Sequence, residues 1–95
     1  HFFIFSDDID WCKNNFNFLF NKTIVDHNHK GFKFSNYLYL MMCCKHFIIP
    51  NSSFGWWAAW LSKNTRKIII APKIWFKGHA ENLTLDLIPS NWVRL

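Results

Sequence analysis

Short, continuous apolar runs recur along this chain, and they constrain its fold more than any other feature. Residues 1–5, 23–27, 46–50 and 67–72 read HFFIF, TIVDH, HFIIP and KIIIAP. Runs of this length that end in turn signals such as proline are typical of buried strands. Because the runs are continuous rather than alternating, we predict a parallel sheet that is covered on both faces.

Helical segments separate these runs. Residues 8–20, 35–45 and 52–63 suit helices of about ten residues; residues 73–83 suggest a short helical or irregular piece, and residues 90–95 complete the chain. Strands that alternate with helices of this length are typical of βαβ units. The predicted fold class is therefore α/β, with a parallel sheet and flanking helices in a single domain over residues 1–95.

Local signals define two of these helices further. The first helix is preceded by a Ser-Asp-Asp cap signal. It places one set of apolar residues on a common face: Ile9, Cys12, Phe16, Leu19 and Phe20. We expect the second helix to be capped by Ser35 or Asn36.

The composition places the chain among folded proteins with an unusual load of aromatic residues. Hydrophobic residues make up 51% of its 95 residues and aromatic residues 20%, with six Trp and eleven Phe, which excludes a disordered chain. An isolated small domain cannot hide so many rings, so we expect some of them to face another domain, a ligand or a membrane surface. Because the chain begins at His1 and runs directly into an apolar strand, we read it as a fragment of a larger protein.

The net charge of +5 and the pI near 9.3 are consistent with a generally basic surface or with an anionic partner. No cluster of Lys and Arg is dense enough to predict nucleic-acid binding. A basic peripheral membrane protein remains a weaker hypothesis, and the apolar runs are too short to span a membrane.

The cysteines do not form a disulfide or zinc pattern. The chain has an odd number of cysteines, three, and two of them are adjacent: Cys12, Cys43 and Cys44. We therefore expect reduced, buried thiols. Asp26 and His27 lie near His29, but no fourth ligand is evident. We therefore predict no metal ion.

The segment NSSFGWWAAWL carries the main functional signal. It follows a strand and opens an apolar helix, the position at which parallel sheets bind ligands. The first turn of a helix has unpaired N–H groups that attract a phosphate, and Ser52 and Ser53 add hydroxyls. Gly55 leaves room for close approach. The simpler alternative is that Asn51 or Ser52 only caps the helix, and we expect the tryptophans of this helix to be packed in a core or between domains.

Five blocks in order resemble the C-terminal part of the α-1,2-fucosyltransferase family, glycosyltransferase family 11. They are FSDDIDWCKNNF, VDHN, LYLMMCCKHFIIPNSSFGWWAAWL, KIIIAPKIWF and DLIPSNWVRL, at residues 5–16, 25–28, 38–61, 67–76 and 86–95. The resemblance implies the Rossmann-like C-terminal, donor-binding lobe of a GT-B transferase. It also implies inverting transfer of fucose from GDP-fucose to the 2-hydroxyl of a galactose, without a metal ion or other cofactor.

The resemblance also assigns candidate roles to residues. The family's NSSFS segment holds the donor diphosphate and matches residues that we therefore expect at that site: Asn51, Ser52, Ser53, Phe54 and Gly55. Gly55 replaces a serine that is often found there, which removes one hydroxyl. Without a divalent cation, the departing diphosphate needs N–H groups, hydroxyls and a cation for stabilisation.

Two further pairs are candidates for contact with the nucleotide or for ordering the cleft. Asp7 and Asp8 match the SDD after the first strand, although capping of the next helix is an equal alternative. Asn36 and Tyr37 stand where the family usually has an acidic residue, which puts guanosine recognition in question. The arginine motif HxRRxD of the family lies upstream, so we predict that the 95 residues alone are inactive.

These inferences lead to one main hypothesis and one alternative. The main hypothesis is the donor lobe of a fucosyltransferase whose partners are GDP-fucose, a galactose-containing glycan and its own N-terminal lobe. The alternative is a non-catalytic nucleotide- or sugar-binding module of the same fold. Unpaired cysteines favour a bacterial enzyme in the cytoplasm or at the inner membrane over an enzyme of the Golgi lumen.

Overall fold

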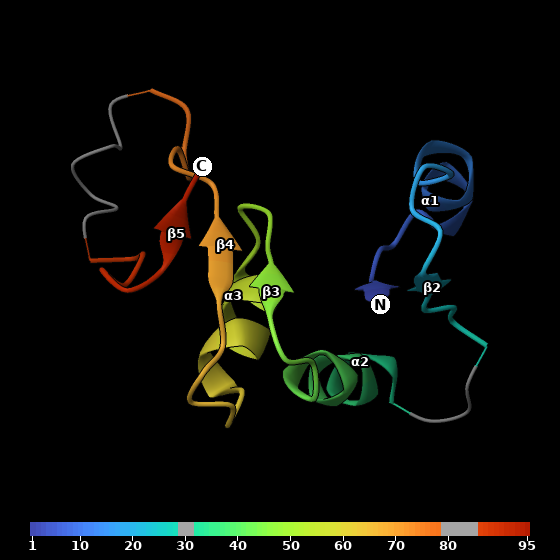
Figure 1. The fold of residues 1–95 in the computed structure, drawn as a ribbon, viewed down its shortest axis with the longest axis horizontal. Helices are drawn as coiled ribbons and strands as arrows, with labels where there is room; N and C mark the ends of the chain where they lie inside the picture. The colour runs from blue at the N-terminus through green and yellow to red at the C-terminus, as the bar shows by residue number, and fades with distance from the viewer. Residues whose placement is uncertain (29–31, 79–85) are drawn as a thin grey trace. The chain divides into compact units, whose positions relative to one another are not determined.

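A computed structural model describes residues 1–28, 32–78 and 86–95 (Figure 1). The described chain divides into two compact units, residues 1–37 and 38–95, and each is described by itself. Both units have parallel strands, and the described residues form three helices, so the predicted α/β class is confirmed. His29 and residues 79–83 of the predicted piece at 73–83 lie outside the described residues, and residues 73–78 form no helix.

The first unit contains a βαβ motif. β1 (Phe2–Ile4) leads through α1 (Ile9–Asn15) to β2 (Lys22–Ile24), which pairs with β1 in parallel. The ladder continues one residue beyond β2, because the Val25 N–H donates to the Ile4 carbonyl at 2.9 Å. β1 and β2 therefore end at the same edge of their sheet, and polar residues follow each strand there.

α1 is shorter than the predicted segment 8–20. Asn15 and Asn17 donate their side-chain amides to backbone carbonyls three or four residues earlier, at 2.9 and 3.1 Å. Asparagine side chains that compete for backbone groups in this way favour helix ends and turns. Cys12 is buried as predicted, but Phe20 is 97% exposed, so the second half of the predicted apolar face is wrong.

α2 (Lys33–Met42) crosses the boundary between the two units and begins before the predicted cap. Ser35 and Asn36 both lie inside the helix, so their assignment as caps is wrong. The Ser35 hydroxyl instead donates to the carbonyl of Phe32 at 3.2 Å. The helix also ends earlier than the predicted residue 45.

The second unit is built on a three-stranded parallel sheet. β3 (Phe47–Ile48), β4 (Ile69–Ala71) and β5 (Val93–Arg94) lie in that order, with β4 central. α3 (Ser53–Leu61) connects β3 to β4 and matches the predicted helix closely. β5 completes the sheet from a segment to which the sequence assigned no element.

α3 lies across one face of this sheet and closes the core there (Figure 1). Its small residues Gly55, Ala58 and Ala59 are buried, which lets the helix approach the strands. The core consists of apolar residues from the helix, the strands and the connections: Phe47, Ile49, Ala59, Ile69, Ala71, Trp75, Ile88 and Trp92. Burial of each large side chain stabilises the unit by roughly 2 kcal/mol.

The other face of this sheet is open within the described residues. Ile48 is 72% exposed, and Ile68, just before β4, is also exposed. Trp57 and Trp60 are each 51% exposed. The prediction of a sheet covered on both faces is therefore wrong for the residues described. Of the helix tryptophans, Trp56 packs against the core, whereas packing of Trp57 and Trp60 between domains stays a prediction.

The three cysteines are free thiols, as predicted. Cys12 is buried, Cys44 is partly buried and Cys43 is exposed, so the prediction of buried thiols holds for Cys12 and fails for Cys43. In the described part of the chain, no helix has the length and apolar character needed to cross a bilayer.

Candidate functional site

The turn between β3 and α3 is the centre of the candidate site. The chain leaves the sheet at Ile49, whose N–H donates to the Ile70 carbonyl at 2.9 Å, and bends so that the Ser52 N–H reaches the Pro50 carbonyl at 2.8 Å. Ser52 has an extended backbone and occupies the N-cap position of α3. Its carbonyl accepts the first helical hydrogen bond, from Trp56, at 3.0 Å.

Ser52 occupies the cap position without capping with its side chain. Its hydroxyl makes no hydrogen bond to the first turn of α3. Among the described residues, no acceptor faces the N–H groups of Ser53 and Gly55. These donors, together with the partial positive charge of a helix start, suit an oxyanion. Ser52 is therefore the N-cap residue, as one of the two simple alternatives predicted, but its side chain does not make the cap hydrogen bond.

Ser53 and Phe54 form the first turn of α3 beside these donors. Ser53 is exposed, and its hydroxyl has no hydrogen-bond partner among the described residues. Phe54 is half-buried and contributes its backbone to the same turn. The solvent side of this turn is therefore polar and accessible at Ser53.

Gly55 is needed for packing between α3 and the strand segment before it. A Cβ atom at this position would lie 3.3 Å from both Cβ and Cγ2 of Ile49 and 3.7 Å from Cδ of Pro50. Ile49 is 4% exposed and has little room to move. The absent side chain therefore explains how the helix start approaches the sheet, and its predicted role beside a phosphate stays a prediction.

Asn51 connects this turn to the chain after β4. Its side-chain amide donates to the carbonyl of Trp75 at 3.2 Å, across 24 residues of sequence. Lys73 follows the end of β4 in the sequence. Its backbone N–H donates to the Leu95 carbonyl, and its side chain is exposed. The carboxyl edge of this sheet therefore carries Asn51, the two serines and one lysine.

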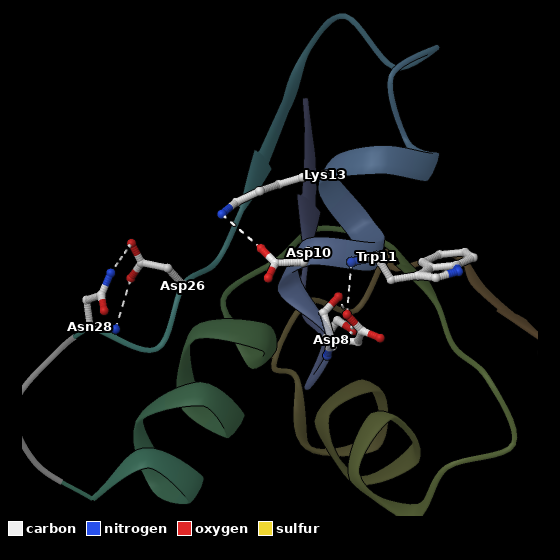
Figure 2. Close-up of polar contacts among 7 residues, drawn as sticks. Asp8, Asp10, Trp11, Lys13, Asp26 and Asn28 are labelled. Atoms are coloured by element: carbon white, nitrogen blue, oxygen red, sulfur yellow. Dashed lines mark hydrogen bonds and ion pairs between the residues drawn. The ribbon is translucent and has the colours of Figure 1, made fainter.

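The carboxyl edge of β1 in the first unit carries Asp7 and Asp8. The Asp8 carboxylate accepts the N–H of Trp11 at 2.9 Å and caps α1 (Figure 2). The Asp8 N–H in turn donates to the Ser6 hydroxyl at 3.0 Å. Asp7 is exposed, and among the described residues its carboxylate has no hydrogen-bond or ion-pair partner. Of the two carboxylates, Asp8 is engaged in capping and Asp7 is available to a ligand.

The carboxyl edge of β2 brings Asp26, His27 and Tyr37 together. The His27 ring nitrogen Nε2 lies 2.9 Å from the Ser6 carbonyl, and the Tyr37 hydroxyl donates to the Asp26 carbonyl. The His27 and Tyr37 rings lie 5.1 Å apart. Desolvation by surrounding atoms, and then the Asp26 charge, raise the pKa of the Tyr37 phenol. Tyr37 therefore helps to order this edge.

Asp26 is paired locally with Asn28. Its carboxylate accepts the backbone N–H and the side-chain amide of Asn28, each at 3.2 Å (Figure 2). Within the described ranges, no group of three His, Cys, Asp or Glu residues could hold a metal ion. Asn36 is exposed on α2. The predicted nucleotide-side residues thus lie in the first unit, and the diphosphate-side residues lie in the second.

The sequence predicted the serine turn but not what holds it. The Asn51 contact with Trp75 depends on long-range packing, and only the Asn-Ser-Ser pattern before a helix indicated that Asn51 belongs to the site. The position of Lys73 past the carboxyl end of a predicted strand offers it as a residue that could reach the ligand, with a solvated side chain as the simpler interpretation.

The comparisons with known proteins agree on one family. The sequence profile described as "Glycosyl transferase family 11" matches residues 1–95. The chain is 42% identical over 94 residues to an alpha-1,2-colitosyltransferase of Escherichia coli, covering 99% of this chain and 32% of that protein. It is 36% identical over 93 residues to the O-antigen biosynthesis glycosyltransferase WbnK of Escherichia coli, covering 97% and 29%. The chain thus spans less than a third of these relatives, and no solved structure matches it.

Proposed function

Because the chain belongs to glycosyl transferase family 11, we propose that it forms the donor-binding part of a galactoside 2-alpha-L-fucosyltransferase. In this proposal, residues 1–95 are most of the C-terminal lobe of a GT-B fold. The enzyme transfers fucose from GDP-fucose to the 2-hydroxyl of a galactose in a surface glycan, with inversion of the anomeric centre. An N-terminal lobe supplies the acceptor site.

The start of α3 is the observation that carries this proposal. The Ser52 hydroxyl is not used in capping, and the N–H groups of Ser53 and Gly55 have no acceptor among the described residues. A helix start that serves only structure normally uses its N-cap side chain to satisfy one of these donors. The unpaired donors support a role in binding the donor diphosphate.

The proposed reaction makes direct use of these donors. As the bond between the anomeric carbon and the diphosphate oxygen breaks, negative charge accumulates on the diphosphate. Preorganised N–H and O–H donors stabilise that charge, and loss of one such donor costs about 100-fold or more in rate. Lys73, at the same edge of the sheet, adds a full positive charge. These groups replace the electrostatic role of a metal ion.

Transfer of colitose instead of fucose is the second candidate. One relative, 42% identical over nearly the whole chain, is named an alpha-1,2-colitosyltransferase. The linkage position in that name agrees with transfer to a 2-hydroxyl, and the sugar that it names is colitose rather than fucose. The residues proposed for the diphosphate would be shared by both donors.

The proposed setting is bacterial. Both relatives are Escherichia coli proteins, and one is named for O-antigen biosynthesis. These names support an enzyme that works in the cytoplasm or at the inner face of the bacterial membrane on glycan precursors, rather than in the Golgi lumen.

The proposal is tested by measuring sugar transfer with the full-length protein that contains this chain. GDP-fucose and a nucleotide-activated colitose are each supplied with a galactoside, in the presence of EDTA. We expect fucose on the galactose 2-hydroxyl. Transfer of colitose alone would support the second candidate, and GDP binding without transfer of either sugar would support a non-catalytic module.

A matched pair of serine variants tests the role of the turn. Ser53→Ala should lower kcat/KM by about 100-fold through loss of one anion donor, with no change in Tm because Ser53 is exposed. Ser90→Ala is the control, since Ser90 is also exposed and has no side-chain hydrogen bond among the described residues. Equal kinetics for the two variants would contradict diphosphate binding by Ser53.

A further inference from the structure

A pocket of about 670 Å³ lies at the opposite end of α3 and β3 from the serine turn. We call it the basic pocket, because Lys45, Lys63 and Arg66 line it together with Ser62. Lys45 precedes β3, and the other three follow α3. The pocket is therefore at the amino edge of the sheet, whereas the proposed donor site is at the carboxyl edge.

The cations of the basic pocket are not neutralised by the protein. No acidic residue lines the pocket, and in the described part of the chain none of the three cations has an ion-pair partner. The sequence concentrates charge here: residues 1–37 carry four Lys and four Asp, whereas residues 38–95 carry seven Lys and Arg against Glu81 and Asp86. The second unit therefore accounts for the whole net charge of +5.

Polar groups at the pocket add hydrogen-bond donors. Ser62 is 6% exposed, and its hydroxyl has no hydrogen-bond partner among the described residues. A buried hydroxyl without a partner is unfavourable, and a bound acceptor would remove that cost. His46 also lines the pocket. Its Nδ1 accepts the Ile68 N–H at 3.1 Å, so the neutral ring keeps its proton on Nε2, which is a further donor.

Asn64 holds the two sides of the pocket together. Its side-chain nitrogen donates to the Lys45 carbonyl at 2.8 Å, and its side-chain oxygen accepts the Arg66 N–H at 3.0 Å. This bridge connects the segment before β3 to the loop after α3. The backbones that carry Lys45 and Arg66 are therefore fixed relative to each other before any ligand arrives.

The C-terminus of α3 disfavours anion binding in the basic pocket, because its carbonyls carry partial negative charge. Lys67 offsets that charge. Its ammonium group donates to the Trp60 carbonyl at 3.0 Å and to the Ser62 carbonyl at 2.7 Å, and partial burial lowers its pKa. The helix end amounts to about half of an elementary charge, so three unpaired cations outweigh it even without Lys67.

We propose that the basic pocket binds a phosphate-type oxyanion, carried either by a free phosphate compound or by a phospholipid headgroup. Three cations with fork-shaped or rotatable donors fit this chemistry. The wall formed by Tyr39 and Met42 offers apolar contact to the carbon portion of an ester. This site is separate from the proposed donor site and does not depend on it.

The test uses the full-length protein at about 50 mM salt, where exposed charges are weakly screened. One arm titrates inorganic phosphate and follows the backbone amide resonances of residues 62–66 and 52–55. The other arm measures co-flotation with vesicles of phosphatidylglycerol and, separately, of phosphatidylcholine. The pocket variant is Lys63→Gln with Arg66→Gln. The control is Lys13→Gln with Lys77→Gln, which removes the same charge from two exposed lysines outside the pocket.

We expect phosphate to shift the resonances of residues 62–66, and the pocket variant to lose at least tenfold in affinity for phosphate, for phosphatidylglycerol vesicles or for both. The control and a charge-keeping variant, Lys63→Arg with Arg66→Lys, should bind like the native protein. Binding in the phosphate arm alone identifies a free ligand, and binding in the vesicle arm identifies a headgroup. Absence of binding in both arms, shifts confined to residues 52–55, or equal losses in the pocket and control variants would overturn the proposal.

Discussion

The side-chain amide of Asn51 donates a hydrogen bond to the backbone carbonyl of Trp75, with 3.2 Å between nitrogen and oxygen. The bond connects the turn before α3 to the segment after β4, and Trp75 itself is buried in the core. Because β3 and β4 are parallel neighbours, both segments leave the sheet at the same edge. The serine turn is thereby anchored to a core residue of the second unit while Ser53 stays exposed.

Replacing Asn51 with alanine should therefore weaken donor binding more than it lowers the stability of the fold. The loss of one partly buried hydrogen bond costs about 1 kcal/mol of unfolding free energy. The KM for the donor nucleotide-sugar should rise about fivefold, because the turn must be ordered again on binding. Denaturant unfolding and donor titration measure the two effects. Asn91→Ala, at an exposed position, should change neither, and an unchanged donor KM in Asn51→Ala would contradict this role.

Gly55→Ala tests the close contact between α3 and the strand segment. Alanine gains about 1 kcal/mol in helix propensity, but its Cβ would lie 3.3 Å from two carbons of the buried Ile49. Crowding of a packed core costs about 1–3 kcal/mol, so we expect a net loss of about 1 kcal/mol in thermal or denaturant unfolding. A variant more stable than the native protein would show that Ile49 can move aside.

Much of the fold follows from local pattern. The apolar runs and the prolines after β3 and β4 predicted parallel strands, and α3 was predicted to within two residues at each end. β5 was missed because the segment SNWVRL has no continuous apolar run; it becomes a strand only through its pairing of Val93 with Ile70 in β4. The end of α1 was missed because asparagine side chains compete for its last carbonyls.

The candidate site was predictable only in part, because long-range packing brings some of its residues together. A strand, two serines and a helix in succession predicted the position of the serine turn, and the structure adds that the Ser52 hydroxyl does not cap α3. The basic pocket was not predicted, because Lys45, Lys63 and Arg66 are too far apart in sequence to form a dense cluster. Packing of β3 and α3, together with the Asn64 bridge, brings them to one place.

The two neighbouring tryptophans of α3 provide a matched comparison. The Trp56 indole N–H donates to the Leu87 carbonyl at 2.8 Å, and its ring packs on Trp60 and Trp92. Trp56→Phe keeps an aromatic ring but leaves that carbonyl unpaired, so unfolding free energy should fall by about 1–3 kcal/mol. Trp57→Phe, at a position that is 51% exposed, should cost less than about 0.5 kcal/mol. Equal losses in the two variants would argue against a role for the Leu87 hydrogen bond.

The adjacent thiols Cys43 and Cys44 should differ in reactivity. Burial, and then the neighbouring Cys43, raise the pKa of the Cys44 thiol, while Cys43 is exposed. The thiolate is the reactive form, so iodoacetamide near pH 7.5 should alkylate Cys43 about tenfold faster than Cys44. Peptide mass spectrometry of a time course measures both rates. In urea, where the chain is unfolded, we expect equal rates. Equal rates in the folded protein would contradict the burial of Cys44.

Ser52 and Asp8 occupy the same position at the start of two helices but are used differently. The Asp8 carboxylate accepts the Trp11 N–H at 2.9 Å, so Asp8→Ala should lower the unfolding free energy by about 1 kcal/mol. The Ser52 hydroxyl makes no cap hydrogen bond, so Ser52→Ala should change stability by less than about 0.5 kcal/mol. Yet Ser52→Ala should reduce kcat/KM for sugar transfer by at least tenfold, because its hydroxyl is proposed to meet the diphosphate. If Ser52→Ala loses stability and keeps its activity, then Ser52 acts as an ordinary cap and the diphosphate is held elsewhere.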